Sequence, residues 1–536
     1  MLRMALVQMD SLVGDITGNT ERIIRTIAAA RDEHGADLVV FPELCITGYP
    51  PEDLLLHNGF RARVEDSVTS ICAASEGIGV VVGYPYYASA DTIYNAASLF
   101  FNAGTLTTYF KQCLPNYGVF DEKRYFTPGQ EAVVVDFKGL PVALTICEDV
   151  WFPGPAKRAA DLGAKLIINA NASPYKVSKQ PEREAVVCQR ARECGVPIAY
   201  VNCVGGQDEL VFDGGSLVAN ANAEIVYRAP AFAETLDVVE FDRDSGEPQS
   251  GSIARHLELA ESVYNAIVLG VKDYVSKNGF SGVVLGLSGG IDSALTLAIA
   301  VDALGADNVQ AVMMPSRYTS DMSVIDAREQ TEWLGVEHHV IPIEPMFTAT
   351  LGVLSDLFAG REPDATEENI QARCRGIILM AISNKTGRML LTTGNKSEMA
   401  VGYATLYGDM AGGFAPIKDC SKTMVYRLAN YRNTLGPAIP ERVITRPPSA
   451  ELAPDQQDSD TLPPYDILDP ILKLFIEADM SVDQIVAEGF DRDIVVRVLA
   501  MIRRNEYKRR QAPPGVRVSE RAFGRDWRYP ITSGYR

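Results

Sequence analysis

The residues best suited to hold a nucleotide's phosphates lie in one segment, 286–293, between a predicted strand at 282–287 and a predicted helix at 294–304. The segment consists of Gly286, Leu287, Ser288, Gly289, Gly290, Ile291, Asp292 and Ser293. Glycines let the backbone approach an anion closely, and a helix N-terminus offers it free N–H groups. No Gly-Lys-Ser/Thr follows, so the loop is not of the Walker type, and it suits a pyrophosphate leaving group. We expect Asp292 to hold Mg²⁺ against the phosphates; the plainer alternative is a glycine-rich turn with Asp292 as helix cap.

A second set of reactive residues lies at the ends of three predicted strands in the first half of the chain. Glu43 ends the run 39–44, Lys111 follows the run 106–110, and Cys147 ends the run 142–147. If these ends converge, Glu43 is the general base and Cys147 the nucleophile, while Lys111 stabilises the thiolate and the tetrahedral oxyanion. Taken singly, each residue has a plainer interpretation as a buried thiol, a loop carboxylate or a surface lysine. None of the five histidines is close in sequence to either set, so carboxylates and lysines must carry any acid–base chemistry.

The elements that must position these residues are short apolar strands alternating with helical patterns. Strands are predicted at 4–9, 37–43, 78–85, 142–147, 165–171 and 198–205, with helices at 21–34 and 181–194. After a polar stretch at 242–251, a helix at 257–277 precedes strands at 282–287, 309–314, 339–343 and 389–393. Strands alternating with helices predict a parallel sheet covered on both faces. A proline-rich acidic segment, 447–464, is predicted to be a mobile loop.

Composition limits the classes of protein that remain. A chain of 536 residues exceeds a single core, and we expect domains at 1–245 and 257–536 joined by a linker at 246–256. The net charge of −19 argues against nucleic-acid binding. Nine cysteines without Cys-x-x-Cys spacing argue against disulfides and zinc. No apolar run reaches the roughly 18–20 residues of a membrane span, and the N-terminus begins as a strand rather than a signal peptide, so we expect a cytoplasmic protein.

The motifs around the two sets resemble two known superfamilies. FPELCITGYP, KQCLPNYGVFDEKRYFTPG and ICEDVW occur in the order found in the nitrilase superfamily, and specifically in its glutaminase branch. SGGIDS resembles the loop of the ATP-pyrophosphatase superfamily, which adenylates substrates. The resemblances imply an α/β fold: an N-terminal αββα nitrilase-like sandwich and a C-terminal Rossmann-like parallel α/β domain.

The resemblance also implies site residues. Glu43, Lys111 and Cys147 would form the hydrolytic triad, and Tyr117, Ser173 and Lys179 would hold glutamine. Glu122 would assist as a second carboxylate, and Tyr49 would shape the pocket. In the second domain, Thr393, Lys422 and Ser449 match ATP-side positions. Asn369, Arg373, Glu398 and Lys508 match positions that contact deamido-NAD⁺, and Glu398 would share Mg²⁺ with Asp292.

Together the two domains resemble the glutamine-dependent NAD⁺ synthetases over essentially the whole chain. The implied reaction is ATP-dependent amidation of deamido-NAD⁺ to NAD⁺, with ammonia from glutamine and with AMP, pyrophosphate and glutamate as products. The family implies a homo-oligomer, at least a dimer through the synthetase domain. Two rivals are considered: another amidotransferase with the same adenylating loop, against which the nitrilase-type domain argues, and a non-catalytic nucleotide-binding protein, against which the complete motifs argue.

Overall fold

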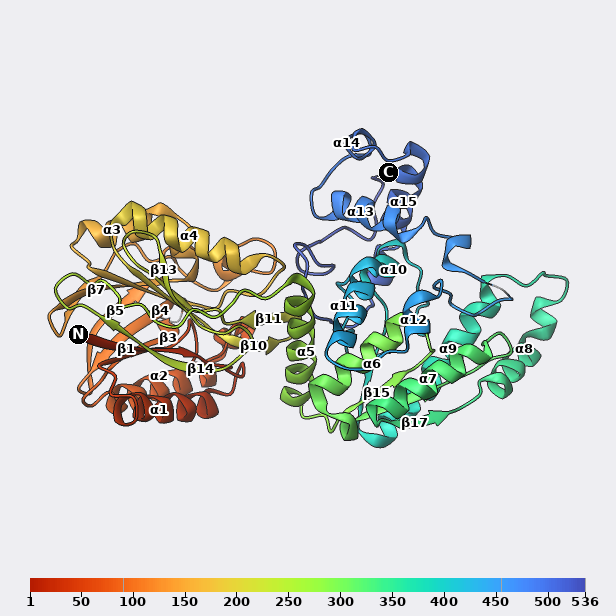
Figure 1. The fold of residues 1–536 in the computed structure, drawn as a ribbon, viewed down its shortest axis with the longest axis horizontal. Coiled ribbons are helices and arrows are strands. Elements are labelled where there is room, and N and C mark those ends of the chain that lie inside the picture. Colours follow the sequence, from red (N-terminus) through yellow and green to blue (C-terminus); the bar gives the residue numbers. More distant parts are fainter. Residues whose placement is uncertain (90, 455, 536) are drawn as a thin grey trace. The chain divides into compact units, whose positions relative to one another are not determined.

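Two units, Met1–Leu257 and Glu258–Arg536, make up the chain (Figure 1). The structure is a computed structural model that describes residues 1–89, 91–454 and 456–535. One residue of the predicted loop 447–464 and the last residue of the predicted second domain therefore lie outside the described part. Residues 251–254, within the segment predicted as a linker, run along unit 1: Gly251 N donates to Val226 O and Ala254 N to Arg228 O.

Unit 1 contains two six-stranded sheets packed face to face. The first sheet has the order β14 (Thr235–Phe241), β1 (Leu2–Gln8), β2 (Leu38–Val40), β3 (Gly79–Tyr87), β4 (Ile93–Phe101), β5 (Gly104–Phe110). The second has the order β13 (Ile225–Arg228), β12 (Leu217–Ala219), β9 (Ile198–Asn202), β8 (Leu166–Asn171), β7 (Leu140–Ile146), β6 (Val134–Phe137). Strands β10 (Val204–Gln207) and β11 (Leu210–Asp213) form a separate hairpin.

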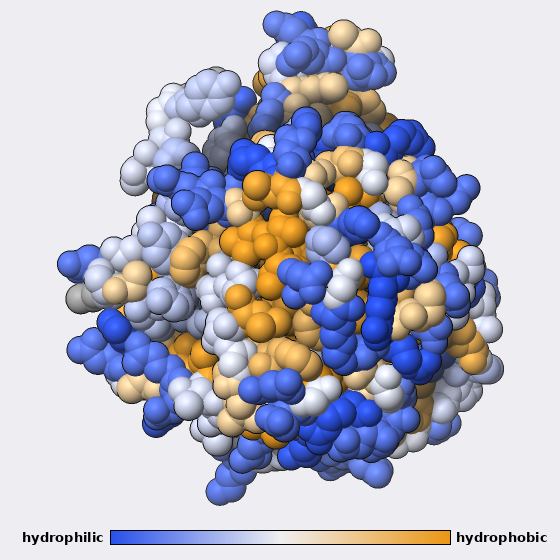
Figure 2. Space-filling model, turned by 90° about the vertical axis from the view of Figure 1, so that its left-hand side faces the viewer, coloured by the Kyte–Doolittle hydropathy of each residue, from blue (hydrophilic) through white to orange (hydrophobic). Residues whose placement is uncertain are grey.

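Helices cover the outer face of each sheet. Helices α1 (Ile16–Asp32) and α2 (Asn58–Ala74) pack on the first sheet, and α3 (Pro153–Asp161) and α4 (Lys179–Cys194) pack on the second (Figure 1). The core between the sheets includes Val40, Val81, Leu144, Ile168 and Val201, all essentially unexposed. Because these strands are apolar on both faces, they read as continuous apolar runs in the sequence. The predicted αββα sandwich is confirmed. From the side that carries the N-terminus, the surface is largely hydrophilic with hydrophobic side chains gathered near its middle (Figure 2).

Unit 2 is built on a four-stranded parallel sheet. Its order is β17 (Glu337–Val340), β16 (Val309–Met313), β15 (Val283–Gly286), β18 (Met389–Leu391). Its helices are α5 (Leu259–Lys277), α6 (Ile291–Leu304), α7 (Asp321–Leu334), α8 (Glu344–Phe358), α9 (Ala365–Thr386), α10 (Lys396–Val401), α11 (Lys422–Thr434), α12 (Glu441–Thr445), α13 (Tyr465–Ile476), α14 (Val482–Ala487), α15 (Arg492–Arg504) and α16 (Glu506–Arg509). The predicted parallel α/β domain is confirmed.

The strand order of unit 2 determines where a ligand can bind. From β15 the chain moves outward through β16 to β17 and then returns to place β18 on the other side of β15. Ligands bind at such a topological switch point, outside the carboxyl ends of the strands. The loop after β15 is the predicted phosphate loop, and the turn after β18 carries Thr393 and leads to Glu398.

Some predicted bounds differ from the structure. The predicted strand at 339–343 is wrong in position, since β17 lies at Glu337–Val340 and Ile343 already caps α8. This edge strand is mostly polar and partly exposed, so it carries little of the apolar signal used to place it. The predicted helix at 294–304 begins three residues earlier, at Ile291, which brings Asp292 and Ser293 into its first turn.

Candidate active sites

The three predicted catalytic residues of unit 1 come from the ends of strands in different sheets. Glu43 follows β2 and Lys111 follows β5 in the first sheet, whereas Cys147 follows β7 in the second. Lys111 Nζ lies 2.7 Å from Glu43 Oε1 and 2.7 Å from Glu122 Oε1. All four residues are at least 96% buried. Buried polar groups packed this closely are stabilised by hydrogen bonds to one another rather than by solvent.

Glu43 is fixed by groups around its carboxylate and its backbone. Asn95 Nδ2 donates to Oε1 at 2.7 Å, and Ala172 N donates to Oε2 at 2.9 Å. On β3, Gly83 passes so close that an added Cβ would lie 2.5 Å from Leu44 N and 2.9 Å from Glu43 Cα. Only glycine allows this approach, so β3 packs directly against the backbone of Glu43 and helps to fix its position.

The backbone of Cys147 is strained. Its φ is +44°, a region that L-residues other than asparagine and aspartate rarely adopt, and it begins a 3₁₀ turn at Cys147–Val150. A nucleophile on a sharp turn after a strand is lifted out of the sheet toward its substrate. Burial, and next the charge of Glu43, raises the pKa of the Cys147 thiol well above its usual range. The thiol is therefore protonated at rest and needs a base. Glu43 is the charged group with the largest effect on the pKa of the thiol, which favours it as that base.

The pKa values of Lys111 and Glu122 are both raised, but by different causes. Burial lowers the pKa of Lys111, but the charges of Glu122 and Glu43 more than offset this and leave it well above its ordinary value. Lys111 therefore remains a cation throughout the physiological range. Burial, partly offset by Lys111, raises the pKa of Glu122 to about 7. Glu122 Oε2 is buried and has no hydrogen-bond partner in the described part of the structure, which leaves it available to a substrate N–H group.

The predicted glutamine residues lie around the same centre. Tyr117 OH donates to Glu148 at 2.9 Å, and Lys179 Nζ lies 3.8 Å from the centre of the Trp151 ring. Ser173 lies two residues after β8 and is held by Arg183, whose Nη2 donates to Ser173 O at 2.7 Å. Burial, and next the charge of Arg183, lowers the pKa of Lys179 to about 8.

Glu148 is a site residue that sequence reasoning missed. It follows Cys147 directly, is only 7% exposed, and accepts the Tyr117 hydroxyl on both oxygens. Burial raises its pKa, and the charges of Lys111 and Lys179 oppose that shift. A carboxylate in this place suits the α-ammonium group of an amino acid. Its position next to the nucleophile in ICEDVW was the available signal.

In unit 2 the predicted phosphate loop folds back on itself through its serines. Ser288 Oγ lies 3.0 Å from Ser293 Oγ and accepts from Gly290 N at 3.2 Å. Gly289 has φ +80°, and a Cβ there would lie 2.4 Å from Ser323 O. The glycine thus allows both the left-handed turn and the close approach of α7. The loop opens onto the N-terminus of α6, where anions bind favourably.

Lys422 lies between the two predicted metal carboxylates. Its Nζ is 2.5 Å from Asp292 Oδ2 and 3.3 Å from Glu398 Oε1. Asn395, the N-cap of α10, donates from Nδ2 to Asp292 Oδ1 at 2.9 Å. Burial, and next the charge of Asp292, raises the pKa of Glu398 to about 8. Lys422 was predicted on the ATP side; its ammonium here neutralises the carboxylates expected to face a cation.

The carboxylates present fit a Mg²⁺ ion that is bound partly by the protein and partly by substrate phosphates, rather than by protein ligands alone. Among the described residues no group of three or more His, Cys, Asp or Glu side chains is placed to hold a metal. Asp292 and Glu398 supply two carboxylates, which both face the Lys422 ammonium. Mg²⁺ in phosphate-transfer sites is bound by one or two carboxylates, with substrate phosphates and water completing its shell.

The residues predicted to bind the dinucleotide meet around one segment, 402–406. Asn369 Oδ1 accepts from Thr405 Oγ1 at 2.8 Å, and Arg373 Nε donates to Leu406 O at 3.2 Å. Lys508 Nζ donates to Gly402 O and Ala404 O, both at 2.8 Å. This segment follows α10 and therefore leads directly from Glu398.

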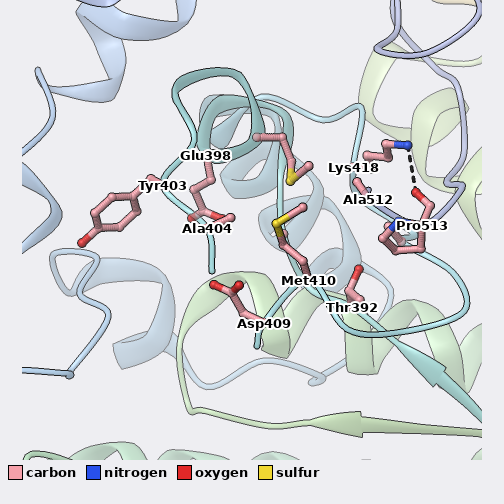
Figure 3. Close-up of a pocket in the computed structure, with 12 residues that line it drawn as sticks. Thr392, Glu398, Tyr403, Ala404, Asp409, Met410, Lys418, Ala512 and Pro513 are labelled. Carbon is pink, nitrogen blue, oxygen red and sulfur yellow. Dashed lines mark hydrogen bonds between the residues drawn. The ribbon is translucent and has the colours of Figure 1, made fainter. Parts of the chain in front are cut away.

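A pocket lies beside Glu398. It is lined by Thr392, Glu398, Tyr403, Asp409, Lys418 and Pro513 among others, and Figure 3 shows Glu398 and Asp409 on its walls. Burial raises the pKa of Asp409 to about 6. Lys418 Nζ donates to Pro513 O at 2.8 Å, which closes one side.

The remaining ATP-side predictions are less closely grouped. Thr393 lies half-buried in the turn between β18 and α10. Ser449 is exposed and donates to Gln456 O within the segment 447–464. That segment reaches α7 through Glu451, whose Oε1 accepts from Ser320 Oγ at 2.8 Å and from Ser323 Oγ at 2.7 Å.

Comparisons with known proteins match both units. The family model for carbon-nitrogen hydrolases matches residues 3–249, and the model for NAD synthases matches residues 263–512. A glutamine-dependent NAD(+) synthetase from Xanthomonas campestris is 53% identical, covering 100% of this chain and 98% of its own. One from Thermotoga maritima is 46% identical over 100% and 99%. The structure of a glutamine-dependent NAD⁺ synthetase from Acinetobacter baumannii, solved with ADP, has TM-score 0.82 at 45% identity, covering 99% of this chain and 98% of its own.

Proposed function

Because this chain belongs to the family of glutamine-dependent NAD(+) synthetases, we propose that its two sites divide one amidation between them. The enzyme is a carbon–nitrogen ligase that converts deamido-NAD⁺ to NAD⁺ with ATP and glutamine. Unit 1 releases ammonia from the glutamine side chain, and unit 2 activates the nicotinate carboxylate that receives it. The observation that carries this proposal is that one chain contains two buried clusters of charged groups. In unit 1, Lys111 is paired with Glu43 and Glu122. In unit 2, Lys422 is paired with Asp292 and Glu398.

In unit 1, Cys147 Sγ attacks the side-chain carbonyl carbon of glutamine while Glu43 takes the thiol proton. Lys111 stabilises the oxyanion of the tetrahedral intermediate. Glu43 returns the proton to the leaving nitrogen, ammonia departs, and water hydrolyses the thioester to glutamate. The free oxygen of Glu122 accepts from the amide N–H, and Tyr117, Ser173, Lys179 and Glu148 hold the amino-acid end.

In unit 2, an oxygen of the nicotinate carboxylate attacks the α-phosphorus of ATP, and pyrophosphate leaves into the loop 286–293. Ammonia then attacks the carbonyl carbon of this adenylate, and AMP leaves with the bridging oxygen. Thr393, Lys422 and Ser449 bind on the ATP side, and Asn369, Arg373, Glu398 and Lys508 on the dinucleotide side. Mg²⁺ held by Asp292 and Glu398 would neutralise charge that develops on the phosphates.

The test is NAD⁺ formation from deamido-NAD⁺ and ATP, measured with glutamine and, separately, with ammonium. Both nitrogen sources are expected to support synthesis, with AMP and NAD⁺ released in equal amounts. No NAD⁺ from either source would refute the proposed function. ADP in place of AMP would refute the adenylation step.

Glutamine binding is expected to weaken as pH rises through 8. Lys179 is charged below its pKa of about 8 and loses the charge above it, so its attraction for the substrate's α-carboxylate is present at low pH and lost at high pH. The KM for glutamine should rise about tenfold per pH unit above 8. Lys179→Arg, which stays charged, should abolish this rise. Glutamate release between pH 7 and 9.5 measures the effect; an equal rise in both enzymes would remove Lys179 from glutamine binding.

We propose that the enzyme is a homo-oligomer assembled through unit 2. Val353 and Leu357, one turn apart on α8, are 85% and 71% exposed, and Ile377 on the neighbouring α9 is 60% exposed. Val353 and Leu357 share one face of α8, and exposed apolar side chains grouped in this way mark an interaction face. Replacing Val353 and Leu357 by aspartate should weaken self-association by about 100-fold, measured by light scattering against Leu162→Asp in unit 1 as control. A wild-type mass of one 58.4 kDa chain would exclude the oligomer.

We place the enzyme in the cytoplasm. All nine cysteines are free, as in proteins of a reducing compartment. No helix in the described parts of the chain is both long and apolar enough to cross a membrane.

A further inference from the structure

The carboxylate of Asp149 is the most fully bonded acidic group beside the hydrolytic centre. The residue is unexposed and accepts four hydrogen bonds. Oδ1 accepts from Gln112 N at 3.1 Å and Cys113 N at 2.8 Å. Oδ2 accepts from Tyr109 OH at 2.8 Å and Ile146 N at 3.0 Å. Asp149 belongs to the acidic run that follows the nucleophile, but its oxygens are bonded to groups other than the thiol.

The four donors are near neighbours in the sequence of the two catalytic residues Lys111 and Cys147. Tyr109 lies two residues before Lys111, and Gln112 and Cys113 follow it directly. Ile146 directly precedes Cys147. Lys111 is also held by backbone bonds, from Lys111 N to Asn95 O and from Gly129 N to Lys111 O, and its Nζ is paired with Glu43 and Glu122. Through these four bonds Asp149 joins the Lys111 segment, at the edge of the first sheet, to the Cys147 turn of the second.

The Cys147 turn needs such a fixed anchor. A non-glycine residue at φ +44° persists only where its surroundings hold it there. Ile146 N would otherwise be a buried donor at the start of a short 3₁₀ turn, and Asp149 supplies its acceptor. Loss of that bond frees the turn to relax toward an ordinary conformation, which moves Sγ.

We propose that Asp149 is the positioning residue of the hydrolytic centre: it holds Lys111 and Cys147 at the separation that the attack on the amide requires. It touches neither the substrate nor the reacting atoms. The inference rests on the roles proposed above for Lys111 and Cys147. A misplacement of about 1 Å at a reacting group costs roughly 100-fold in rate.

Asp149→Asn is the informative substitution because it keeps the shape and removes acceptors. Whichever way the amide lies, its NH₂ group faces backbone N–H donors, either those of Gln112 and Cys113 or that of Ile146. At least one backbone donor on one side of the junction therefore loses its acceptor. Asp136→Asn is the matched control, since Asp136 caps an exposed turn of the same unit through Gly139 N.

The experiment uses the full-length enzyme and counts competent sites by covalent labelling of Cys147 with a diazoketone analogue of glutamine. For Asp149→Asn, glutamate release per labelled site should fall about 100-fold, with the KM for glutamine within about threefold of wild type and ammonium-driven NAD⁺ synthesis unchanged. Asp136→Asn should match wild type. A purely structural role would reduce the number of labelled sites but not the turnover of each, and that result would overturn the proposal.

Two further outcomes separate the positioning role from the proposed function. Wild-type turnover per labelled site in Asp149→Asn overturns the positioning role while leaving Cys147 as nucleophile; absence of labelling in the wild type overturns the proposed function instead. If Asp149→Asn is insoluble, Tyr109→Phe carries the test, since it removes one donor and keeps the carboxylate. It should lower turnover per site by about fivefold, and unchanged turnover would overturn the proposal.

Discussion

Replacing Cys147 by alanine is expected to lower glutamine-driven NAD⁺ synthesis by at least about 10⁴-fold, because it removes the thiol that forms the thioester. Synthesis from added ammonium should stay within about twofold of wild type, since unit 2 contains all the groups proposed for adenylation. The measurement is NAD⁺ formed from each nitrogen source at saturating ATP and deamido-NAD⁺.

The control for this experiment is Cys188→Ala. Cys188 is a half-buried free cysteine on α4 of the same unit, and its loss should leave both activities unchanged. Retention of glutamine-driven synthesis in Cys147→Ala would exclude Cys147 as nucleophile. Loss of the ammonium-driven reaction as well would show that the substitution acts through unit 2, contrary to the proposed division.

Asp292→Asn is expected to lower synthesis from both glutamine and ammonium by about 10³-fold. The substitution removes one of two carboxylates from the proposed metal site, and the charge stabilisation that a metal provides amounts to several kcal/mol. The isosteric amide still accepts the hydrogen bond from Asn395, and Lys422 keeps Glu398 as partner, so the fold should be retained.

Its measurement combines NAD⁺ formation at increasing Mg²⁺ with thermal unfolding. The Mg²⁺ concentration for half-maximal activity should rise, whereas the unfolding temperature should stay close to wild type. Asp307→Asn, an exposed position in the same unit, is the control. Wild-type synthesis in Asp292→Asn would rule out its role at the metal.

The sequence allowed the catalytic residues of unit 1 to be predicted because strand ends that carry polar residues are visible in a single chain. Glu43, Lys111 and Cys147 each end an apolar run, and the structure brings the first two within 2.7 Å. The layered fold followed from the same runs. Which residues hold glutamine, ATP, deamido-NAD⁺ and Mg²⁺ stays a prediction.

Residues that hold others in place were harder to find. Asn395 is the N-cap of α10 and forms a capping box with Glu398, a pattern that Asn-x-x-Glu signals, yet its bond to Asp292 joins residues 103 apart. In the sequence, Asp149 is visible only as the third residue of the run that begins at Cys147. Its partners at 109–113 become neighbours only when the two sheets pack, and no local pattern carries that information.

The division of the hydrolytic centre between two sheets has a consequence for the newly made chain. Glu43 and Lys111 are synthesised before Cys147, but β1 pairs along its length with β14, so the first sheet is complete only when residues 235–241 have emerged. Until the sheets have packed, the thiol and its base belong to separate pieces of structure. The onset of glutamine hydrolysis during synthesis or refolding therefore reports the time at which the two sheets of unit 1 pack together.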